Sequence, residues 1–375
     1  MTRTKTIGVG LVGVGNWGRY GHIPALRLLS QYEIVAVSSR SAERAAQIAA
    51  EHAIPHHFVN VLDLVTHPDV DLVVVLPPAP GHAAVVKAAC DAGKDVYCEW
   101  PLTTRTSDSE ALLALVQSAG ARHFVGLQRT VGASARYLRD LLASGEIGKL
   151  RSVRMQVTVP SFGPTRPPGL TWTLAADNFS HVLSIYGGHF MHMLFSAVGF
   201  PQTLTAVVRI QFPELTLSVT GESFPNETPD GIVIQGVLEN DGALFQIQIE
   251  GGKTHGSGLR IDLTGFDGDL TILNDRAFAT KRDNSFEGAT RQYPDWTSFP
   301  VPDSYQQIPP SSLDASVQDL AHLYAAFARE GVQGENTVPN FSDAVMLHRL
   351  LDAIYCSSAT GKSIDIRINN EHRDQ

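Results

Sequence analysis

Three features are scarce in this chain: cysteine, long apolar runs and excess positive charge. Its 375 residues contain three cysteines, at positions 90, 98 and 356, and this odd, widely spaced set predicts neither a disulfide framework nor a zinc knuckle. No window approaches the roughly 18 consecutive apolar residues of a membrane span, so we expect no membrane association. The segment before the first predicted strand, Met1 to Lys5, is short and polar, which favours a cytoplasmic protein. A formal net charge of −9 argues against direct nucleic-acid binding.

A glycine-rich turn stands close to the start of the chain. Ile7–Val12 is a short apolar run that predicts a buried strand, and a helix-like run follows the glycines. In this setting G-x-G-x-x-G is typical of a dinucleotide site, with the phosphates at the helix N-terminus. The first glycine permits the tight turn, the second lets the backbone approach a pyrophosphate, and the third lets helix and strand pack closely. The alternative is a glycine turn without a ligand. The cofactor-binding residues predicted here are Gly13, Gly15, Asn16, Trp17 and Gly18.

Strand-like and helix-like segments alternate up to residue 127. This alternation predicts a doubly wound parallel sheet of the Rossmann type. The predicted strands are Ile7–Val12, Glu33–Ser38, His57–Val59, Val70–Leu76, Asp95–Cys98 and His123–Leu127. Among the helices between them, we expect Ser41, Asn60 and Ser107 to be N-caps.

The pattern changes after residue 127, so we predict a Rossmann domain over 1–127 and a second α/β domain over 128–375. Several runs between Thr203 and Ile272 alternate polar and apolar residues, which predicts a large, mostly antiparallel sheet. Pro160–Gly169 and Ala279–Ser312 are expected to be irregular. The helices predicted here are Ala133–Ala143, Val182–Val198, Leu313–Arg329 and Asp343–Ser358.

The second predicted strand ends without the carboxylate that NAD-binding proteins place near the adenosine ribose. The chain reads Ser38-Ser39-Arg40 there. Ser39 can donate a hydrogen bond to a phosphate and Arg40 can pair with it, so these residues favour NADP(H), with NAD(H) as the alternative. Arg40 also suits a solvated position before a helix cap.

The loop after the fourth predicted strand begins with two prolines. The carboxyl edge of an open α/β sheet is where ligands bind, so we expect Pro77 and His82 beside the cofactor. His82 equally suits an ordinary position in the first turn of the following helix.

At this point the sequence resembles a known family. The glycine turn, VVVLPPAPGH ending at His82, CEWPLTT beginning at Cys98, and Gly126-Leu-Gln-Arg129 resemble, in that order and spacing, the Gfo/Idh/MocA oxidoreductases. The resemblance implies a C-terminal domain whose open sheet makes a homodimer or homotetramer. It also implies that four residues lie at the cofactor: Glu99, Trp100, Pro101 and Gln128.

The chain departs from this family at its catalytic positions. Family members have Glu-Lys-Pro where this chain has Glu99-Trp100-Pro101, and tryptophan has no titratable proton to transfer. The family's Asp-x-x-x-His reads Ile185 to His189 here, so only the histidine is kept. We therefore expect His189 as the proton carrier, with Tyr186 to orient or relay. His192 would complete an H-x-x-H, but no carboxylate or cysteine stands nearby, so we expect no metal.

Three functions stay open from the sequence. The first is a nicotinamide-dependent oxidoreductase that acts on a sugar, a polyol or a related carbonyl compound. The second follows from Glu99-Trp100, which resembles the Gal80-like branch of the family: a dinucleotide-binding transcriptional regulator that contacts a protein partner without turnover. The third is a reductase similar to biliverdin reductase, which has Glu-Tyr-Pro at this place and whose substrate needs little acid catalysis.

Overall fold

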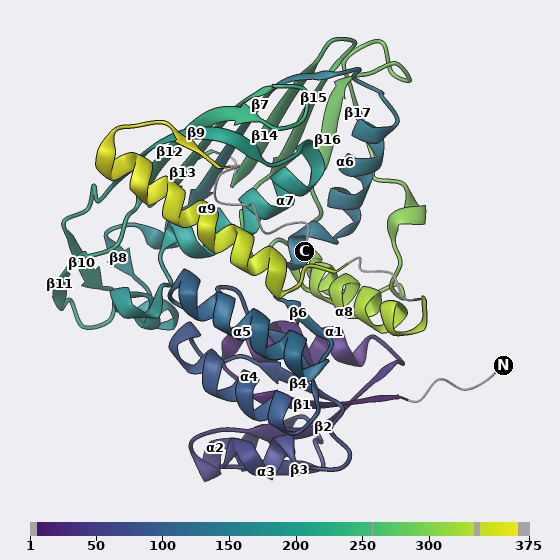
Figure 1. Cartoon of the computed structure of the whole chain (residues 1–375), viewed down its shortest axis with the longest axis vertical. Coiled ribbons are helices and arrows are strands. Elements are labelled where there is room, and N and C mark those ends of the chain that lie inside the picture. The colour runs from purple at the N-terminus through teal and green to yellow at the C-terminus, as the bar shows by residue number, and fades with distance from the viewer. Residues whose placement is uncertain (1–5, 257, 334–337, 367–375) are drawn as a thin grey trace. The chain divides into compact units, whose positions relative to one another are not determined.

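The structure is a computed structural model that describes residues 6–256, 258–333 and 338–366 (Figure 1). The prediction of a cytoplasmic protein used Met1 to Lys5, and these residues lie outside the described residues. The described chain forms two compact units, and no single cut in the sequence separates them. The first unit takes in residues 6–132, 307–313, 317–333 and 338–345, and the second takes in the remainder.

A six-stranded parallel sheet forms the centre of the first unit, in the order β3-β2-β1-β4-β5-β6. Central strands of such a sheet are covered on both faces, and all four residues of β4 are fully buried. The strands are β1 (Ile7–Val12), β2 (Tyr32–Ser38), β3 (His56–Phe58), β4 (Leu72–Val75), β5 (Asp95–Cys98) and β6 (His123–Val125). Each predicted strand matches one of these within two residues, so the predicted Rossmann sheet is confirmed.

Short helices connect these strands, and two of the three predicted N-caps are confirmed. The Ser41 hydroxyl accepts a hydrogen bond from the Arg44 amide at 3.2 Å, and Asn60 Oδ1 accepts one from the Leu62 amide at 3.1 Å. The Ser107 prediction is wrong, because the helix already begins at Thr106. In the turn before this helix, the Thr103 hydroxyl accepts a hydrogen bond from the Arg105 amide and donates one to the Arg105 carbonyl. The helical segments are Gly18–His22 (a π-helical turn), α1 (Ile23–Arg27), α2 (Ala42–Glu51), α3 (Val61–Val65), Ala79–Gly81 (3₁₀), α4 (His82–Asp91), α5 (Thr106–Ala119) and Gln128–Thr130 (3₁₀).

The core of the first unit is completed by a helix from late in the chain. From Val317 onward, α8 (Ala315–Gln333) belongs to this unit. Its Phe327 stacks on Phe124 of β6 with ring centroids 4.0 Å apart, and the backbone carbonyl of Tyr324 accepts a hydrogen bond from the Tyr32 hydroxyl at 2.7 Å. A division of the sequence at residue 127 leaves this helix out.

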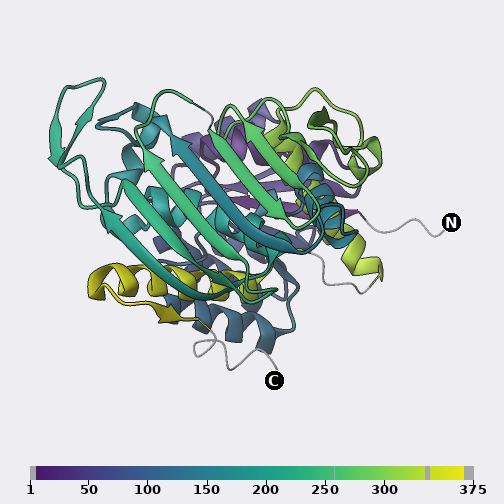
Figure 2. The same cartoon turned by 90° about the horizontal axis from the view of Figure 1, so that it is seen from above.

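A nine-stranded sheet forms the second unit, in the order β17-β16-β15-β14-β7-β13-β12-β9-β18 (Figure 2). Among the described strands of this sheet, only β7 and β13 pair in parallel, so the predicted mostly antiparallel sheet is confirmed. Along β13 exposed and buried residues alternate, as expected for a sheet with one covered face. The strands are β7 (Leu150–Val159), β9 (Pro201–Arg209), β12 (Gly231–Leu238), β13 (Leu244–Gly251), β14 (Leu259–Gly265), β15 (Asp269–Asn274), β16 (Ser285–Ala289), β17 (Thr297–Phe299) and β18 (Ile364–Asp365).

The longer helical segments of the second unit are α6 (Ala133–Ala143), a π-helical turn over Leu183–Gly187 that runs into α7 (Gly188–Val198), and α9 (Phe341–Thr360) from Met346 onward. Its 3₁₀ segments are Pro160–Phe162, Pro168–Thr173, Ala176–Asn178 and Asp303–Tyr305. Gly187 lies close to the sheet, since a Cβ added there would come within 3.1 Å of Ile249 Cδ1 on β13. No helix within the described residues is long and apolar enough to cross a membrane.

Two segments predicted to be irregular are more ordered than expected. Ala279–Ser312 contains β16 and β17, because Phe286 and Phe299 are buried and both pack on the Tyr137 ring. Pro160–Gly169 contains β8 (Thr165–Arg166), which joins β10 (Glu214–Leu217) and β11 (Ser223–Pro225) in a small separate sheet. Neither segment has the alternation that identifies a strand from sequence alone.

Candidate functional site

The glycine turn of the first unit has the geometry that its spacing predicts. Gly13 has a φ of +79°, and a Cβ added there would lie 2.9 Å from Pro77 Cγ. A Cβ on Gly18 would lie 2.9 Å from Val14 Cγ1, so only glycine lets the helix pack this closely. A Cβ on Gly15 would meet nothing within 4 Å, so the backbone at this point is open to a ligand.

The side chain of Trp17 contacts the loop that follows β5. Its indole Nε1 donates a hydrogen bond to Glu99 Oε1 at 3.2 Å. A Cβ on Gly21 would lie 2.7 Å from the Trp17 ring, so a glycine at position 21 leaves the space that the indole occupies. Asn16, by contrast, is exposed at the start of the helix. Of these two predicted cofactor residues, Asn16 therefore faces solvent and Trp17 has a partner within the protein.

One oxygen of Glu99 joins three side chains. Besides Trp17, Glu99 Oε1 accepts a hydrogen bond from the Tyr97 hydroxyl at 2.7 Å and lies 2.6 Å from His22 Nε2. Burial and the neighbouring carboxylate raise the pKa of Tyr97 well above its usual range, so its hydroxyl stays protonated and donates. Gly126 permits this arrangement, because a Cβ there would lie 2.5 Å from the Tyr97 hydroxyl. Glu99 therefore connects the end of β5 to the first helix.

His22 was not predicted as part of this site. It is fully buried, and its second ring nitrogen lies 2.7 Å from the Tyr324 hydroxyl of α8. Nothing in the sequence indicated this contact, because His22 stands in an ordinary helical pattern and Tyr324 lies 302 residues further along the chain.

Both ring nitrogens of His82 contact backbone carbonyls. Nε2 lies 2.7 Å from the Pro77 oxygen and Nδ1 lies 3.0 Å from the Leu102 oxygen. The side chain is 1% exposed, and burial lowers its pKa. His82 thus joins the loops after β4 and β5, and its contact with a cofactor stays a prediction. Between those contacts the Trp100–Pro101 peptide is cis, and Trp100 is buried.

Gln128 is buried directly after β6. Its side chain is 3% exposed, and within the described part of the chain its Oε1 has no hydrogen-bond donor. An unsatisfied buried acceptor costs free energy, so this atom requires a donor from a water molecule or from a bound group.

At the end of β2, Ser39 is half-buried and Arg40 is exposed. The Ser39 amide donates to the Phe58 carbonyl at 3.1 Å, which fixes the backbone beside β3. The two side chains therefore lie at the accessible end of the strand, next to the capped start of α2.

In the second unit, the predicted catalytic residues lie in a group of aromatic rings. Phe278 packs edge-on against His189, with ring centroids 4.8 Å apart, and against Tyr186, at 4.9 Å. His189 is 4% exposed and Tyr186 is half-buried. The π-helical turn and α7 bring these two predicted residues to the same ring. Phe278 itself lies one residue before the segment predicted to be irregular.

Arg166 borders this group and was also missed. Its guanidinium lies over the Phe162 ring, 4.7 Å from the centroid, and Phe162 in turn contacts Tyr186. Nη1 donates to the carbonyls of Ser161 and Gly163, at 3.2 and 2.7 Å. The Nε of Arg166 is buried and has no acceptor among the residues the structure describes. Its sequence setting, a Pro/Gly-rich loop, did not indicate a buried cation.

Comparison with known proteins finds one family model that matches the first unit and another that matches part of the second. Residues 7–127 match the family model described as the oxidoreductase family with an NAD-binding Rossmann fold, Gfo/Idh/MocA, and residues 134–274 match the C-terminal domain of Gal80p. The dehydrogenase aclE of Aspergillus oryzae is 30% identical over 248 residues, which are 63% of this chain and 68% of that protein. The chain belongs to the Gfo/Idh/MocA oxidoreductase family. Its match to the Gal80p C-terminal domain places it in the Gal80-like branch.

Solved structures of similar fold include a transcriptional regulator and a dehydrogenase. A super-repressor mutant of Gal80p from Saccharomyces cerevisiae superposes with a TM-score of 0.86 at 21% identity, covering 96% of this chain and 98% of that one. Levoglucosan dehydrogenase in complex with NADH and levoglucosan superposes with a TM-score of 0.82 at 18% identity, covering 96% and 100%. These likenesses establish the fold and leave the choice between regulator and enzyme to the residues.

Within this Gfo/Idh/MocA chain, the departures from the family signatures are unequal. Glu99 of the Glu-Lys-Pro signature is kept and has three partners, while the lysine position holds the buried Trp100. In the second unit, the usual aspartate position holds the half-buried Ile185, one residue before Tyr186. Of these three signature positions, only the glutamate is therefore kept in this chain.

Proposed function

We propose that the protein is a nicotinamide-dependent oxidoreductase that transfers hydride between NADP(H) and a sugar, a polyol or a related carbonyl compound. The observation that carries the proposal is the open backbone at Gly15, in a turn whose other glycines are needed for packing. This is where the fold brings a pyrophosphate against the helix N-terminus. The membership of the family and the 30% identity to a dehydrogenase support a redox role.

The residues of the first unit fit a dinucleotide. The amides at the start of the helix after Gly15 would bind the phosphates, and Trp17, held by Glu99, would line the side of the turn. The unsatisfied Oε1 of Gln128 suits a carboxamide N–H donor. When bound, the nicotinamide supplies a hydride donor or acceptor at its C4 position. Trp100 and Pro101 are proposed to shape the nicotinamide side, and Pro77 packs on the turn at Gly13.

A preference for NADP(H) is supported by the residues at the end of β2. Arg40 is exposed and Ser39 is half-buried, so both can reach a 2′-phosphate, and no carboxylate stands between β2 and Ser41 to accept a ribose hydroxyl. The NAD-binding description of the family keeps NAD(H) as the alternative.

His189 is proposed to move the proton that accompanies hydride transfer. Oxidation of an alcohol requires a base for the hydroxyl proton, and imidazole titrates close to neutral pH. Tyr186 would orient this histidine through the ring of Phe278 that both contact. The unsatisfied Nε of Arg166 offers a donor for an oxygen of a polar substrate.

Two measurements test this function. We expect NADPH to quench the tryptophan fluorescence of the purified protein, because Trp17 and Trp100 both belong to the first unit. We then expect a change in nicotinamide absorbance with at least one member of a panel of sugars, polyols and their carbonyl counterparts. Absence of any dinucleotide binding would overturn the proposal, and the same titration with NADH measures the preference.

The second candidate is a Gal80-like regulator. It is favoured by the match of residues 134–274 to the Gal80p C-terminal domain and by the replacement of both the lysine and the aspartate of the family. Tight dinucleotide binding without turnover on any substrate, together with co-purification of a transcription factor, would support the regulator over the enzyme. A reductase similar to biliverdin reductase would instead turn over a conjugated pigment and tolerate the loss of His189.

The nine-stranded sheet supports the expected homodimer or homotetramer. Val207 and Val233 lie opposite each other on β9 and β12, and they are 51% and 37% exposed. Exposed apolar side chains on a sheet face are typical of surfaces that pair with another subunit. Light scattering of the purified protein measures this directly, and the mass of a single chain would contradict it.

A further inference from the structure

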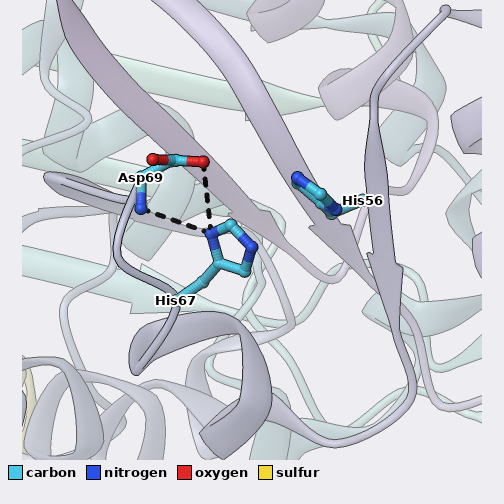
Figure 3. A group of neighbouring side chains, drawn as sticks. All are labelled: His56, His67 and Asp69. Carbon is cyan, nitrogen blue, oxygen red and sulfur yellow. Dashed lines mark hydrogen bonds and ion pairs between the residues drawn. The ribbon is translucent and has the colours of Figure 1, made fainter.

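We propose that His56, His67 and Asp69 bind a divalent transition metal ion such as Zn²⁺ (Figure 3). One ligand atom from each of the three residues lies within 4.8 Å of the other two. Two imidazoles and one carboxylate are a donor set that suits Zn²⁺, Co²⁺ and Ni²⁺ better than Mg²⁺ or Ca²⁺, which prefer oxygen ligands.

The three residues come together at the amino edge of the parallel sheet. His56 is the first residue of β3, and α3 (Val61–Val65) returns the chain to this edge, so that His67 and Asp69 stand just before β4. The glycine turn that follows β1 lies at the opposite, carboxyl edge of the same sheet. The proposed metal site is therefore separate from the proposed cofactor site.

The geometry is close to that of a bound metal. The rings of His56 and His67 have centroids 4.3 Å apart, and Asp69 Oδ2 lies 4.0 Å from His67 Nδ1. Tetrahedral Zn²⁺ with ligands at about 2.1 Å needs donor atoms about 3.4 Å apart, so the side chains must close by about 1 Å. The Asp69 side chain is 67% exposed and can rotate to do so. The backbone of His56 pairs with β2, and its imidazole ring makes no hydrogen bond to any described residue, so a ring nitrogen is available.

The turn that carries two of the ligands is held firmly. The Val70 amide donates to the His67 carbonyl at 3.2 Å, which closes a β-turn with Pro68 in its second position. Lys94 Nζ donates to the carbonyls of both His67 and Val70, at 3.2 and 2.6 Å. A Cβ on Gly8 would come within 1.8 Å of the Asp69 carbonyl, so the turn lies directly against β1. Such bracing lowers the conformational cost of binding an ion.

The surroundings leave room for the remaining ligands. A hollow of about 280 Å³ borders the site and is lined by His56, Asp69, Glu33 and Asp71 among others. Water molecules in this hollow can complete the coordination of the ion, and the nearby carboxylates favour a cation. The Asp71 carboxylate already accepts a hydrogen bond from the Gly8 amide at 2.9 Å, so Asp71 acts outside the direct ligand set.

The test measures binding of Zn²⁺ and Co²⁺ to the untagged full chain. By equilibrium dialysis with elemental analysis, we expect about one Zn²⁺ per chain, bound with micromolar or tighter affinity. Co²⁺ should give the visible absorption bands of a tetrahedral complex, and Zn²⁺ should displace it. His56→Ala, His67→Ala and Asp69→Asn should each weaken binding by at least about tenfold, since even residues that only support a ligand cost this much.

His57→Ala is the matched control, because His57 is the next residue on β3 and its side chain is exposed on the other face. It should bind Zn²⁺ like the unchanged protein. Asp69→Asn changes an exposed side chain and should keep the fold, which circular dichroism checks. At one Zn²⁺ concentration, Zn²⁺ should raise the melting temperature of the unchanged protein and of His57→Ala equally, and should raise that of Asp69→Asn less. Failure of the unchanged protein to retain Zn²⁺, or equal binding by the Asp69→Asn variant, would overturn the proposal.

Discussion

The two units hold their candidate functional residues in different ways. In the first unit, Glu99 fixes Trp17, Tyr97 and His22 through a single carboxylate oxygen, and the glycine turn is shaped by close backbone packing. In the second unit, His189 and Tyr186 each make a T-shaped ring contact with Phe278. The first arrangement keeps the family's signature glutamate, and the second lies beside a position where the family's aspartate is replaced by Ile185. The proposed cofactor site and the proposed proton carrier thus belong to different units, and we expect variants in one unit to affect one of the two proposed properties.

The largest effect is expected from His189→Ala in the second unit. If His189 carries the proton, turnover should fall by about 10²–10⁴-fold, the usual contribution of a positioned acid or base. Dinucleotide affinity, which we assign to the first unit, should stay nearly unchanged when it is measured by fluorescence titration. His192→Ala is the matched control, since this histidine lies one helical turn further along α7 and is equally buried. Undiminished turnover in His189→Ala would remove the proposed proton carrier.

Glu99→Ala tests the connections within the first unit. The change leaves the buried Tyr97 hydroxyl and His22 without their carboxylate partner, and breaking a buried charged network of this kind costs about 3 kcal/mol. Urea unfolding followed by tryptophan fluorescence should show this loss. Glu99→Gln, which keeps an acceptor oxygen, should lose less. Equal stability of the alanine variant and the unchanged protein would mean that the three hydrogen bonds contribute nothing net.

Gly15→Val separates binding from folding. The added side chain meets no protein atom near its Cβ, so the melting temperature should change little. The same side chain would occupy the space where a pyrophosphate approaches, so affinity for the dinucleotide should fall by about tenfold or more. Gly18→Ala is the contrasting variant, since its Cβ would come within 2.9 Å of Val14 and should lower the melting temperature. Normal affinity in Gly15→Val would place the cofactor elsewhere.

The difference between the units also explains what the sequence could predict. The strands of the Rossmann sheet and the roles of Gly13 and Gly18 follow from neighbouring residues, because a βα turn is a local structure. The contacts of His22 with Tyr324 and of His189 with Phe278 join residues far apart in the chain, and no periodicity encodes them. The β16 and β17 strands were missed for the same reason, since Phe286 and Phe299 are fixed by packing on Tyr137 rather than by an alternating pattern.

The smallest effect concerns the choice between the two nicotinamide cofactors, which depends on one exposed cation of the first unit. Arg40→Ala should weaken NADPH binding by about fivefold, because an exposed ion pair contributes at most about 1 kcal/mol. NADH lacks the 2′-phosphate, so its affinity should not change, and the preference between the two cofactors should shrink by the same factor. Raising the salt concentration should reduce the NADPH advantage of the unchanged protein and leave Arg40→Ala unaffected, because exposed charges are screened. Equal losses for NADPH and NADH would show that Arg40 contacts a part common to both, such as the adenine ring, and the NADP(H) preference would then rest on Ser39 alone.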